Sequence, residues 1–213
     1  MLKKILIIRF SSFGDIAQCM SVLSPLNEQF PNSQIYFLTK EEFSALVCLH
    51  PKVKKVINFN KKEGILGLIR LGLGLRNEKF DIVYDAHSNL RSGILRLILK
   101  PFSNSIFIER PKNRFKRILL FWFRINKFPN PFRGLKSYLA PLKKLGVSQN
   151  PTNLRIKDSF DIKKWVPFEK FIVLAPSAAW ELKRWPLEYW KSLIELCPTE
   201  KFVILGGASD KFC

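Results

Sequence analysis

The sequence is poor in the residues that build metal sites and disulfide frameworks. It has two histidines and four cysteines in 213 residues, and Cys19, Cys48, Cys197 and Cys213 lie far apart with no C-x-x-C pair. A zinc site draws on about four such ligands at short spacings, so the composition argues against a metal. The spacing predicts reduced thiols in a cytosolic protein, with Cys19 inside a buried helix.

Long uncharged apolar stretches are also missing. The start, Met1 to Lys4 followed by apolar residues, has the form of a signal peptide, but Arg9 and Asp15 interrupt the run and no small-residue cleavage site follows. In the basic middle of the chain, the longest uncharged apolar run is Ile118 to Phe123, far too short to span a bilayer. We therefore expect a soluble or peripheral protein whose membrane contact, if any, is interfacial.

Acidic residues are scarce relative to basic ones. The chain has 17 Asp and Glu against 36 Lys and Arg, a formal net charge of +19. This excess favours anionic partners: nucleic acid, phosphorylated metabolites or an anionic membrane surface. The hydrophobic content of 47% supports a real core and excludes a disordered tail, and the length fits one large domain or one domain and part of a second.

A strand that runs into a small-residue turn is the most informative local pattern. The apolar run Lys4–Phe10 predicts a strand covered on both faces, and Ser11, Ser12, Phe13 and Gly14 lead to Asp15. Helical spacing follows up to Pro31, which places this turn at the carboxyl end of the strand, where open α/β sheets bind ligands. Asp15 could serve as a base or only as a helix cap, and the pattern leaves both open.

Strand and helix patterns alternate along the first half of the chain. This alternation predicts βαβ units and an α/β fold with a mostly parallel sheet. A glycine-rich stretch at 72–75 lies inside a helical pattern, so we reject a dinucleotide fingerprint there. The predicted strands are Lys4–Phe10, Gln34–Leu38, Lys54–Phe59, Asp81–Asp85 and Ser105–Ile108, and the predicted helices are Asp15–Phe30, Glu41–Leu49, Lys62–Asn77 and Ser92–Leu99.

The segment Arg110–Leu145 is basic and aromatic. It has eleven Lys and Arg and no acidic residue, and its aromatic residues are interleaved with the cations. A helix predicted over Arg114–Lys127 has the composition of an interfacial segment at an anionic membrane, although an ordinary packed helix with a solvated basic face fits as well. Stacking on bases would also suit this composition, but no recognised nucleic-acid module is present.

A second α/β pattern follows a polar linker at Lys157–Lys164. It consists of strand Lys170–Ala175, helix Leu187–Leu196 and strand Lys201–Leu205. The connecting loop, Pro176–Pro186, has small residues at its start and Lys183 and Arg184 before the helix. Backbone N–H groups and a lysine in such a loop can hold a diphosphate, and a surface loop with solvated cations is the alternative.

The order of these motifs resembles the heptosyltransferases of glycosyltransferase family 9. The resemblance rests on S-S-F-G-D-I at 11–16, D-A-H-S-N-L-R-S-G at 85–93, A-P-S-A-A-W-E-L-K-R-W-P at 175–186 and I-L-G-G at 204–207. It implies a GT-B architecture, in which residues 1–155 form an acceptor-side Rossmann-like domain and 166–213 the opening of a nucleotide-sugar domain. It also implies inverting transfer of heptose from ADP-heptose to the lipid A-linked inner core of lipopolysaccharide, without metal or cofactor.

The resemblance also assigns roles to single residues. Asp15 matches the proposed catalytic base, Gly14 gives the acceptor room beside it, and Lys183 and Ser177 match the phosphate-binding loop. The remaining matched residues line the acceptor side of the cleft: Ser11, Ser12, His87, Asn89 and Arg91. Relatives often carry Gln where this chain has His87, so we interpret His87 as a polar cleft residue and not as a base.

Family members continue beyond the last motif found here, with a second acidic position and a D-[ST]-G-x-x-H motif. We therefore expect the 213 residues alone to bind ADP weakly or not at all and to be inactive. We expect a cytoplasmic enzyme peripheral to the inner membrane, with ADP-heptose, the lipid A core and the anionic membrane as partners and no nucleic acid. A non-enzymatic basic module that binds anionic glycolipid is the alternative.

Overall fold

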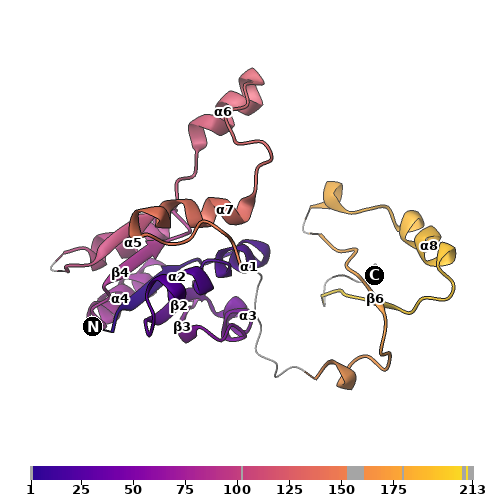
Figure 1. The fold of residues 1–213 in the computed structure, drawn as a ribbon, viewed down its shortest axis with the longest axis horizontal. Helices are drawn as coiled ribbons and strands as arrows, with labels where there is room; N and C mark the ends of the chain where they lie inside the picture. The colour runs from indigo at the N-terminus through magenta and orange to yellow at the C-terminus, as the bar shows by residue number, and fades with distance from the viewer. Residues whose placement is uncertain (1, 102, 153–160, 179, 208–209, 211–213) are drawn as a thin grey trace. The chain divides into compact units, whose positions relative to one another are not determined.

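The computed structural model describes residues 2–101, 103–152, 161–178, 180–207 and 210. The chain divides into two compact units, residues 1–157 and residues 158–213, which are described separately below (Figure 1). None of the helices within the described residues is long and apolar enough to cross a membrane.

The first unit is built on a five-stranded sheet. All neighbouring strands are parallel, in the order β3-β2-β1-β4-β5, which confirms the predicted α/β class. In β1, residues 5–8 are fully buried because helices cover both faces of the sheet, as the continuous apolar run predicted. The strands are β1 (Lys4–Ile8), β2 (Gln34–Lys40), β3 (Val53–Phe59), β4 (Ile82–Asp85) and β5 (Ile106–Glu109).

The two faces of the sheet form two hydrophobic clusters. Ile5 and Ile7 of β1 point into the cluster that also contains residues of α1, α2, α3 and α7, whereas Leu6 and Ile8 point into the cluster with α4 and α5. This division follows from the period-two alternation of side chains along a strand. The helices are α1 (Phe13–Met20), α2 (Leu23–Gln29), α3 (Ser44–Cys48), α4 (Gly64–Arg76), α5 (Leu90–Leu99), α6 (Arg114–Phe123) and α7 (Gly134–Leu139), with 3-10 turns η1 (Glu41–Phe43), η2 (Lys61–Glu63) and η3 (Ala140–Leu145).

The single helix predicted over Asp15–Phe30 is wrong. The structure has two helices, α1 and α2, that meet at Ser21 and Val22. The Ser21 hydroxyl donates to the carbonyl of Gln18 at 2.7 Å, and Pro25 has no N–H to offer a continuous helix but fits the first turn of a new one.

Three other predicted helices differ from the observed elements at their ends. The pattern at 41–49 forms η1 followed by α3, and the pattern at 62–77 forms η2 followed by α4. The helix predicted to reach Lys127 ends at Phe123, because Arg124 adopts a left-handed conformation with φ of 58°. The other predicted elements form with slightly shifted ends.

Gly72 serves helix packing, which agrees with the rejection of a nucleotide fingerprint. It is buried within α4, and a Cβ atom there would lie 3.0 Å from Cδ1 of Ile98 and 3.1 Å from Cδ2 of Leu95. The absent side chain therefore lets α4 and α5 pack closely on the same face of the sheet.

The second unit has a parallel pair of strands and one α-helix among its described residues. These are β6 (Ile172–Leu174), β7 (Phe202–Ile204) and α8 (Leu187–Leu196), with turns η4 (Ile162–Lys164) and η5 (Glu181–Lys183). The start of the predicted linker, residues 157–160, lies outside the described residues. Val166 and Leu174 are buried, but Ile172, Val173 and Leu205 are 41%, 47% and 54% exposed.

Candidate active site

The first motif and the segment after β4 meet at the carboxyl edge of the sheet. β1 and β4 are neighbours, so the residues that follow them are brought together across 77 positions of sequence. The Arg9 guanidinium donates to the carbonyl of Ala86 at 2.8 Å, and the rings of Phe10 and His87 are 5.5 Å apart. The predicted site residues from both segments therefore share one edge of the sheet.

The Asp15 carboxylate is held from three sides and remains accessible. Its Oδ2 lies 2.7 Å from Nη2 of Arg9 and accepts from the Ser12 hydroxyl at 3.1 Å and the Ser12 N–H at 3.4 Å. Its Oδ1 accepts from the Tyr138 hydroxyl at 3.2 Å. The contacts with Ser12 give Asp15 a place in the cap of α1, but 43% of its side chain is exposed, so the carboxylate can also meet a ligand.

The electrostatic environment keeps Asp15 charged. Partial burial raises the pKa of this carboxyl, but the Arg9 charge and the hydrogen bonds from Ser12 and Arg9 outweigh that effect. The pKa therefore lies below its ordinary value, and Asp15 is ionised at neutral pH.

Three residues of the site were not identified from the sequence: Arg9, Tyr138, and Arg110, whose guanidinium carbon lies 3.8 Å from the centroid of the Tyr138 ring. Arg9 is 7% exposed and Tyr138 is fully buried, although both contact Asp15 or its immediate surroundings. A lone arginine at the end of an apolar strand was a usable signal for Arg9. Nothing in the local sequence could place Tyr138, because it lies 123 residues beyond Asp15 on α7.

His87 is a neutral imidazole in this setting. Burial, together with the nearby charges of Arg9 and Lys112, lowers its pKa to about 4. Its position is set by Asp85, a buried residue whose Oδ1 accepts the backbone N–H groups of His87 at 3.0 Å and Ser88 at 2.7 Å. Burial raises the pKa of Asp85, in contrast to Asp15.

The other predicted residues of this edge differ in burial and in whether their side chains are already hydrogen-bonded. Asn89 caps α5: its Oδ1 accepts from the Ser92 N–H at 3.0 Å, so its side chain is engaged in the helix start. Arg91 is exposed in the first turn of that helix, and Ser11 is half-buried. A Cβ at Gly14 would meet nothing within 4 Å, so internal packing does not require glycine there.

The predicted phosphate loop belongs to the second unit. Lys183 is exposed in η5, and Ser177 is half-buried beyond the end of β6, while Ala179 lies outside the described residues. The Gly207 N–H, which donates to Asp210 at 2.7 Å, and the Ser177 hydroxyl hold the pKa of the Asp210 carboxyl below its ordinary value. Ser177 and Gly207 thus belong to one polar cluster at the carboxyl ends of β6 and β7.

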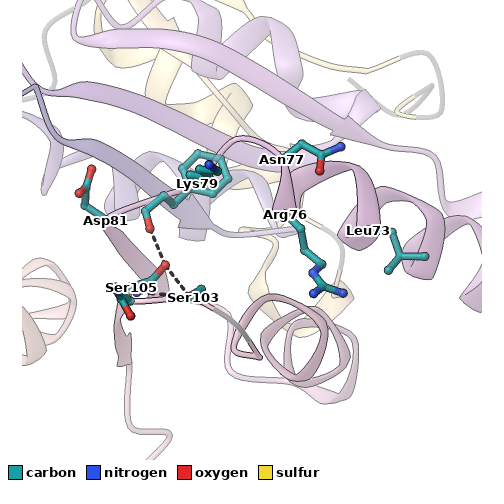
Figure 2. Close-up of a pocket in the computed structure, with 9 residues that line it drawn as sticks. Leu73, Arg76, Asn77, Lys79, Asp81, Ser103 and Ser105 are labelled. Atoms are coloured by element: carbon teal, nitrogen blue, oxygen red, sulfur yellow. Dashed lines mark hydrogen bonds between the residues drawn. The ribbon is translucent and has the colours of Figure 1, made fainter.

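Among the described residues of the first unit, two of the larger cavities are not lined by Asp15. One, of about 660 Å³, is lined in part by Asp81 and Ser105, which directly precede β4 and β5, so it occupies the amino-terminal edge of the sheet (Figure 2). The other, of about 540 Å³, lies between α6 and α7 and is lined by Lys116, Arg133 and Lys136. This second cavity is lined by basic residues and adjoins the aromatic helix α6.

Helix α6 presents its aromatic side chains to solvent. Phe115, Phe121 and Trp122 are 71%, 74% and 83% exposed, and none of the residues of this helix is buried. In Figure 1, α6 projects away from the helices that pack on the sheet. The alternative of an ordinary packed helix with a solvated basic face does not describe α6.

Comparisons with curated proteins point to one enzyme family. The chain is 23% identical over 194 residues to the lipopolysaccharide core heptosyltransferase OpsX of Haemophilus influenzae. This alignment covers 87% of the chain and 54% of OpsX. It is 27% identical over 148 residues to lipopolysaccharide heptosyltransferase 1 of Campylobacter coli, covering 60% of this chain and 43% of that protein. The chain spans about half the length of these curated relatives.

Solved structures share the fold. A glycosyl transferase family 9 protein of Veillonella parvula matches with a TM-score of 0.75 at 20% identity, over 99% of this chain and 64% of the other. The E. coli heptosyltransferase WaaC with ADP matches with a TM-score of 0.68 at 20% identity, over 96% of this chain and 67% of WaaC. These matches confirm the predicted GT-B fold class. A family model described as glycosyltransferase family 9 (heptosyltransferase) matches residues 68–211, more than half of the sequence, and the chain therefore belongs to this family.

Proposed function

We propose that this chain carries the acceptor side and the first donor-binding loop of an inverting heptosyltransferase. The donor is ADP-heptose, and the acceptor is the lipid A-linked inner core of lipopolysaccharide. One observation supports this most: in a family 9 chain, an accessible and ionised carboxylate, Asp15, lies at the carboxyl edge of the parallel sheet. OpsX is a lipopolysaccharide core heptosyltransferase, and the structure of WaaC contains ADP.

In the proposed reaction, Asp15 is the general base. The acceptor hydroxyl oxygen attacks the anomeric carbon of heptose, and its proton passes to the Asp15 carboxylate. The bond between the anomeric carbon and the diphosphate oxygen breaks, and ADP leaves with the electron pair. Attack from the face opposite the leaving group inverts the anomeric configuration. Gly14, exposed and without close neighbours, leaves room for the acceptor beside Asp15.

The second unit supplies the proposed donor contacts. Lys183, exposed before α8, and the Ser177 hydroxyl would bind the diphosphate and offset the charge that grows on the leaving ADP. On the first unit, Ser11, Ser12, His87, Asn89 and Arg91 would surround the acceptor sugar. The neutral state of His87 fits a hydrogen-bonding role there and not that of a base.

We further propose that the protein works at the cytoplasmic face of the inner membrane. The exposed aromatic residues of α6 are flanked by Arg114, Arg117 and Arg124, which is the arrangement of an interfacial segment at anionic lipid. The basic cavity between α6 and α7 suits the phosphate groups of such a surface. The same surface would serve a non-enzymatic glycolipid-binding module, which is the second candidate function.

We propose residues 1–155 and 166–213 as the two domains, the second of which needs further partners for its sheet. Its strands β6 and β7 leave Ile172, Val173 and Leu205 exposed, and the chain spans about half the length of its relatives. We therefore expect no turnover and weak ADP binding from these 213 residues alone. Calorimetry with ADP tests this, and micromolar binding would contradict it.

The enzymatic proposal is tested in an extended protein, in which this chain is joined to the C-terminal part of a family relative such as OpsX. In this extended protein, Asp15→Asn should lower kcat for heptose transfer by about two or more orders of magnitude, the usual effect of losing a general base. Lys183→Ala should raise the Kd for ADP, while Asp15→Asn should not.

Asp81→Asn is the matched control for the Asp15 substitution. It makes the same chemical change at the opposite edge of the sheet, where Asp81 accepts the Lys4 N–H at 2.7 Å, and it should leave kcat unchanged. Transfer at the wild-type rate by Asp15→Asn would show that Asp15 is only a helix cap and would favour the glycolipid-binding module.

A further inference from the structure

We infer that Arg9 and Tyr138 are positioning residues for Asp15: together they fix its carboxylate so that Oδ1 is the oxygen left to take a proton. This inference rests on the proposed role of Asp15 as base. It goes beyond that role because it assigns different tasks to the two carboxylate oxygens and names the residues that separate them.

The oxygen Oδ2 is fully engaged. It receives the Arg9 guanidinium at 2.7 Å, the Ser12 hydroxyl at 3.1 Å and the Ser12 N–H at 3.4 Å. A carboxylate oxygen offers about two lone-pair sites, so Oδ2 has no capacity left for a substrate. Among the described residues, Oδ1 accepts one hydrogen bond, from Tyr138 at 3.2 Å. One lone pair of Oδ1 therefore remains available.

Arg9 is itself held rigidly. Its side chain is 8% exposed, and its Nη1 donates to the carbonyl of Ala86 at 2.8 Å while Nη2 pairs with Asp15. If Asp15 swung away, a buried guanidinium would lose its counter-charge, which is strongly unfavourable. The arginine thus restrains the carboxylate through charge as well as through geometry.

Tyr138 is held by contacts on its ring and on its backbone. The Tyr84 hydroxyl donates to the Tyr138 carbonyl at 2.7 Å, and the guanidinium carbon of Arg110 lies 3.8 Å from the centroid of the Tyr138 ring. Arg110 also donates to the hydroxyl of Ser137 at 2.8 Å. Burial raises the pKa of Tyr138, so its phenol stays protonated and donates to Oδ1 at every working pH.

These contacts join elements that are far apart in sequence. Arg9 follows β1, Asp15 lies in α1 and Tyr138 lies in α7, whose packing against α1 completes the carboxylate site. In the reaction, Oδ1 would take the proton of the acceptor hydroxyl. The new carboxylic acid O–H would then lie beside the Tyr138 oxygen, whose lone pairs can accept a hydrogen bond from it. Tyr138 thus orients the base before transfer and can hydrogen-bond the carboxylic acid after it.

The test is a carbon-13 NMR titration of the Asp15 carboxyl in the 213-residue chain, with Asp15→Asn to identify its signal. Arg9→Met should raise the pKa of Asp15 by about one unit or more, the usual effect of removing an adjacent arginine. Tyr138→Phe should raise it by a fraction of a unit. Tyr84→Phe is the matched control, because it removes a buried hydroxyl that touches Tyr138 but not Asp15, and it should leave the pKa of Asp15 unchanged.

The other ionisable groups near Asp15 must be kept constant in this titration. They are His87 on the loop after β4 and Cys19 on α1, besides Arg9 and Tyr138 themselves. A His87→Gln background removes the only one of these that titrates near the acidic range. If Arg9→Met fails to fold, Arg9→Lys keeps the charge with a different geometry and should still raise the pKa, by a smaller amount.

Kinetics in the extended protein separate this inference from the proposed function. Tyr138→Phe should lower kcat about tenfold without raising KM, and it should move the acidic limb of the pH–rate profile upward. An unchanged Asp15 pKa in both Arg9→Met and Tyr138→Phe would overturn the positioning roles, even if Asp15 proves essential. Full activity of Asp15→Asn would overturn the catalytic proposal and leave the titration result standing.

Discussion

The guanidinium of Arg110 stacks on the ring of Tyr138, with 3.8 Å between its central carbon and the ring centroid. Arg110 follows β5 and Tyr138 lies in α7, so this contact fastens the short helix to the sheet edge. It also places a cation of the basic segment in the interior of the site and not on a solvated face.

Replacing Arg110 by Met should therefore destabilise the first unit. The variant loses the stacking contact and the hydrogen bond to Ser137, and we expect the free energy of unfolding to fall by about 1–2 kcal/mol. Chemical denaturation followed by circular dichroism measures this. Arg91→Met, the same change at an exposed position of α5, should alter stability little, and an equal loss in both variants would contradict the specific role of the stack.

Two glycines of α4 should respond differently to the same substitution. Gly74→Ala should raise the free energy of unfolding by about 0.5–1 kcal/mol, because alanine favours the helix and a Cβ there meets nothing within 4 Å. Gly72→Val should lower it by about 1–3 kcal/mol, because the added atoms would overlap Leu95 and Ile98 of α5. Thermal unfolding of both variants measures the contrast, and stabilisation by Gly72→Val would show that the helices can separate at no cost.

The stability of the first unit should depend on His87 in mildly acidic solution. Its folded pKa of about 4 lies below the ordinary value of 6.5, so between these pH values the unfolded chain takes up a proton that the folded chain refuses. The free energy of unfolding should therefore fall as the pH is lowered from about 6.5 to about 4.

Urea denaturation at several pH values, in wild type and His87→Gln, measures this effect. The variant should lack the part of the slope that comes from His87. Asp85 acts in the opposite direction, because its raised pKa favours proton uptake by the folded chain, and the difference between the two proteins removes its contribution. Parallel curves would contradict the assignment to His87.

The surface of α6 should bind anionic vesicles through charge and aromatic insertion. Reversal of Arg114, Lys116 and Arg117 to Glu should weaken binding to anionic vesicles by about 1 kcal/mol or more per residue and change binding to neutral vesicles little. Trp122→Ser should weaken binding to both, because its side chain is 83% exposed and available for insertion.

Reversal of Lys143 and Lys144 to Glu is the control for these vesicle measurements. Both residues are exposed in η3, so this variant changes the net charge without touching α6. A loss equal to that of the α6 reversal would show that overall charge, and not the α6 surface, drives binding.

The sequence by itself determined the elements and the local motifs of this protein. Continuous apolar runs identified the strands of the parallel sheet, and the pattern around 11–15 placed Asp15 at the carboxyl end of β1, because side-chain periodicity and turn residues are local properties. Motif order gave the family. Local effects overrode the helical pattern where Ser21 and Pro25 divide one predicted helix into two, and where Arg124 ends α6 before Lys127.

Tertiary structure alone decided what surrounds the base. Asp15 meets Arg9 from its own strand end, but Tyr138 reaches it across 123 residues, and Arg110 reaches Tyr138 from a third element. No spacing in the sequence encodes these contacts, because they arise when the sheet order β1-β4-β5 brings three strand ends together and α7 packs over them. The hydrogen bond to Oδ1 of Asp15 follows from that packing, whereas its charge state is set by Arg9 and Ser12, which lie close to it in the sequence.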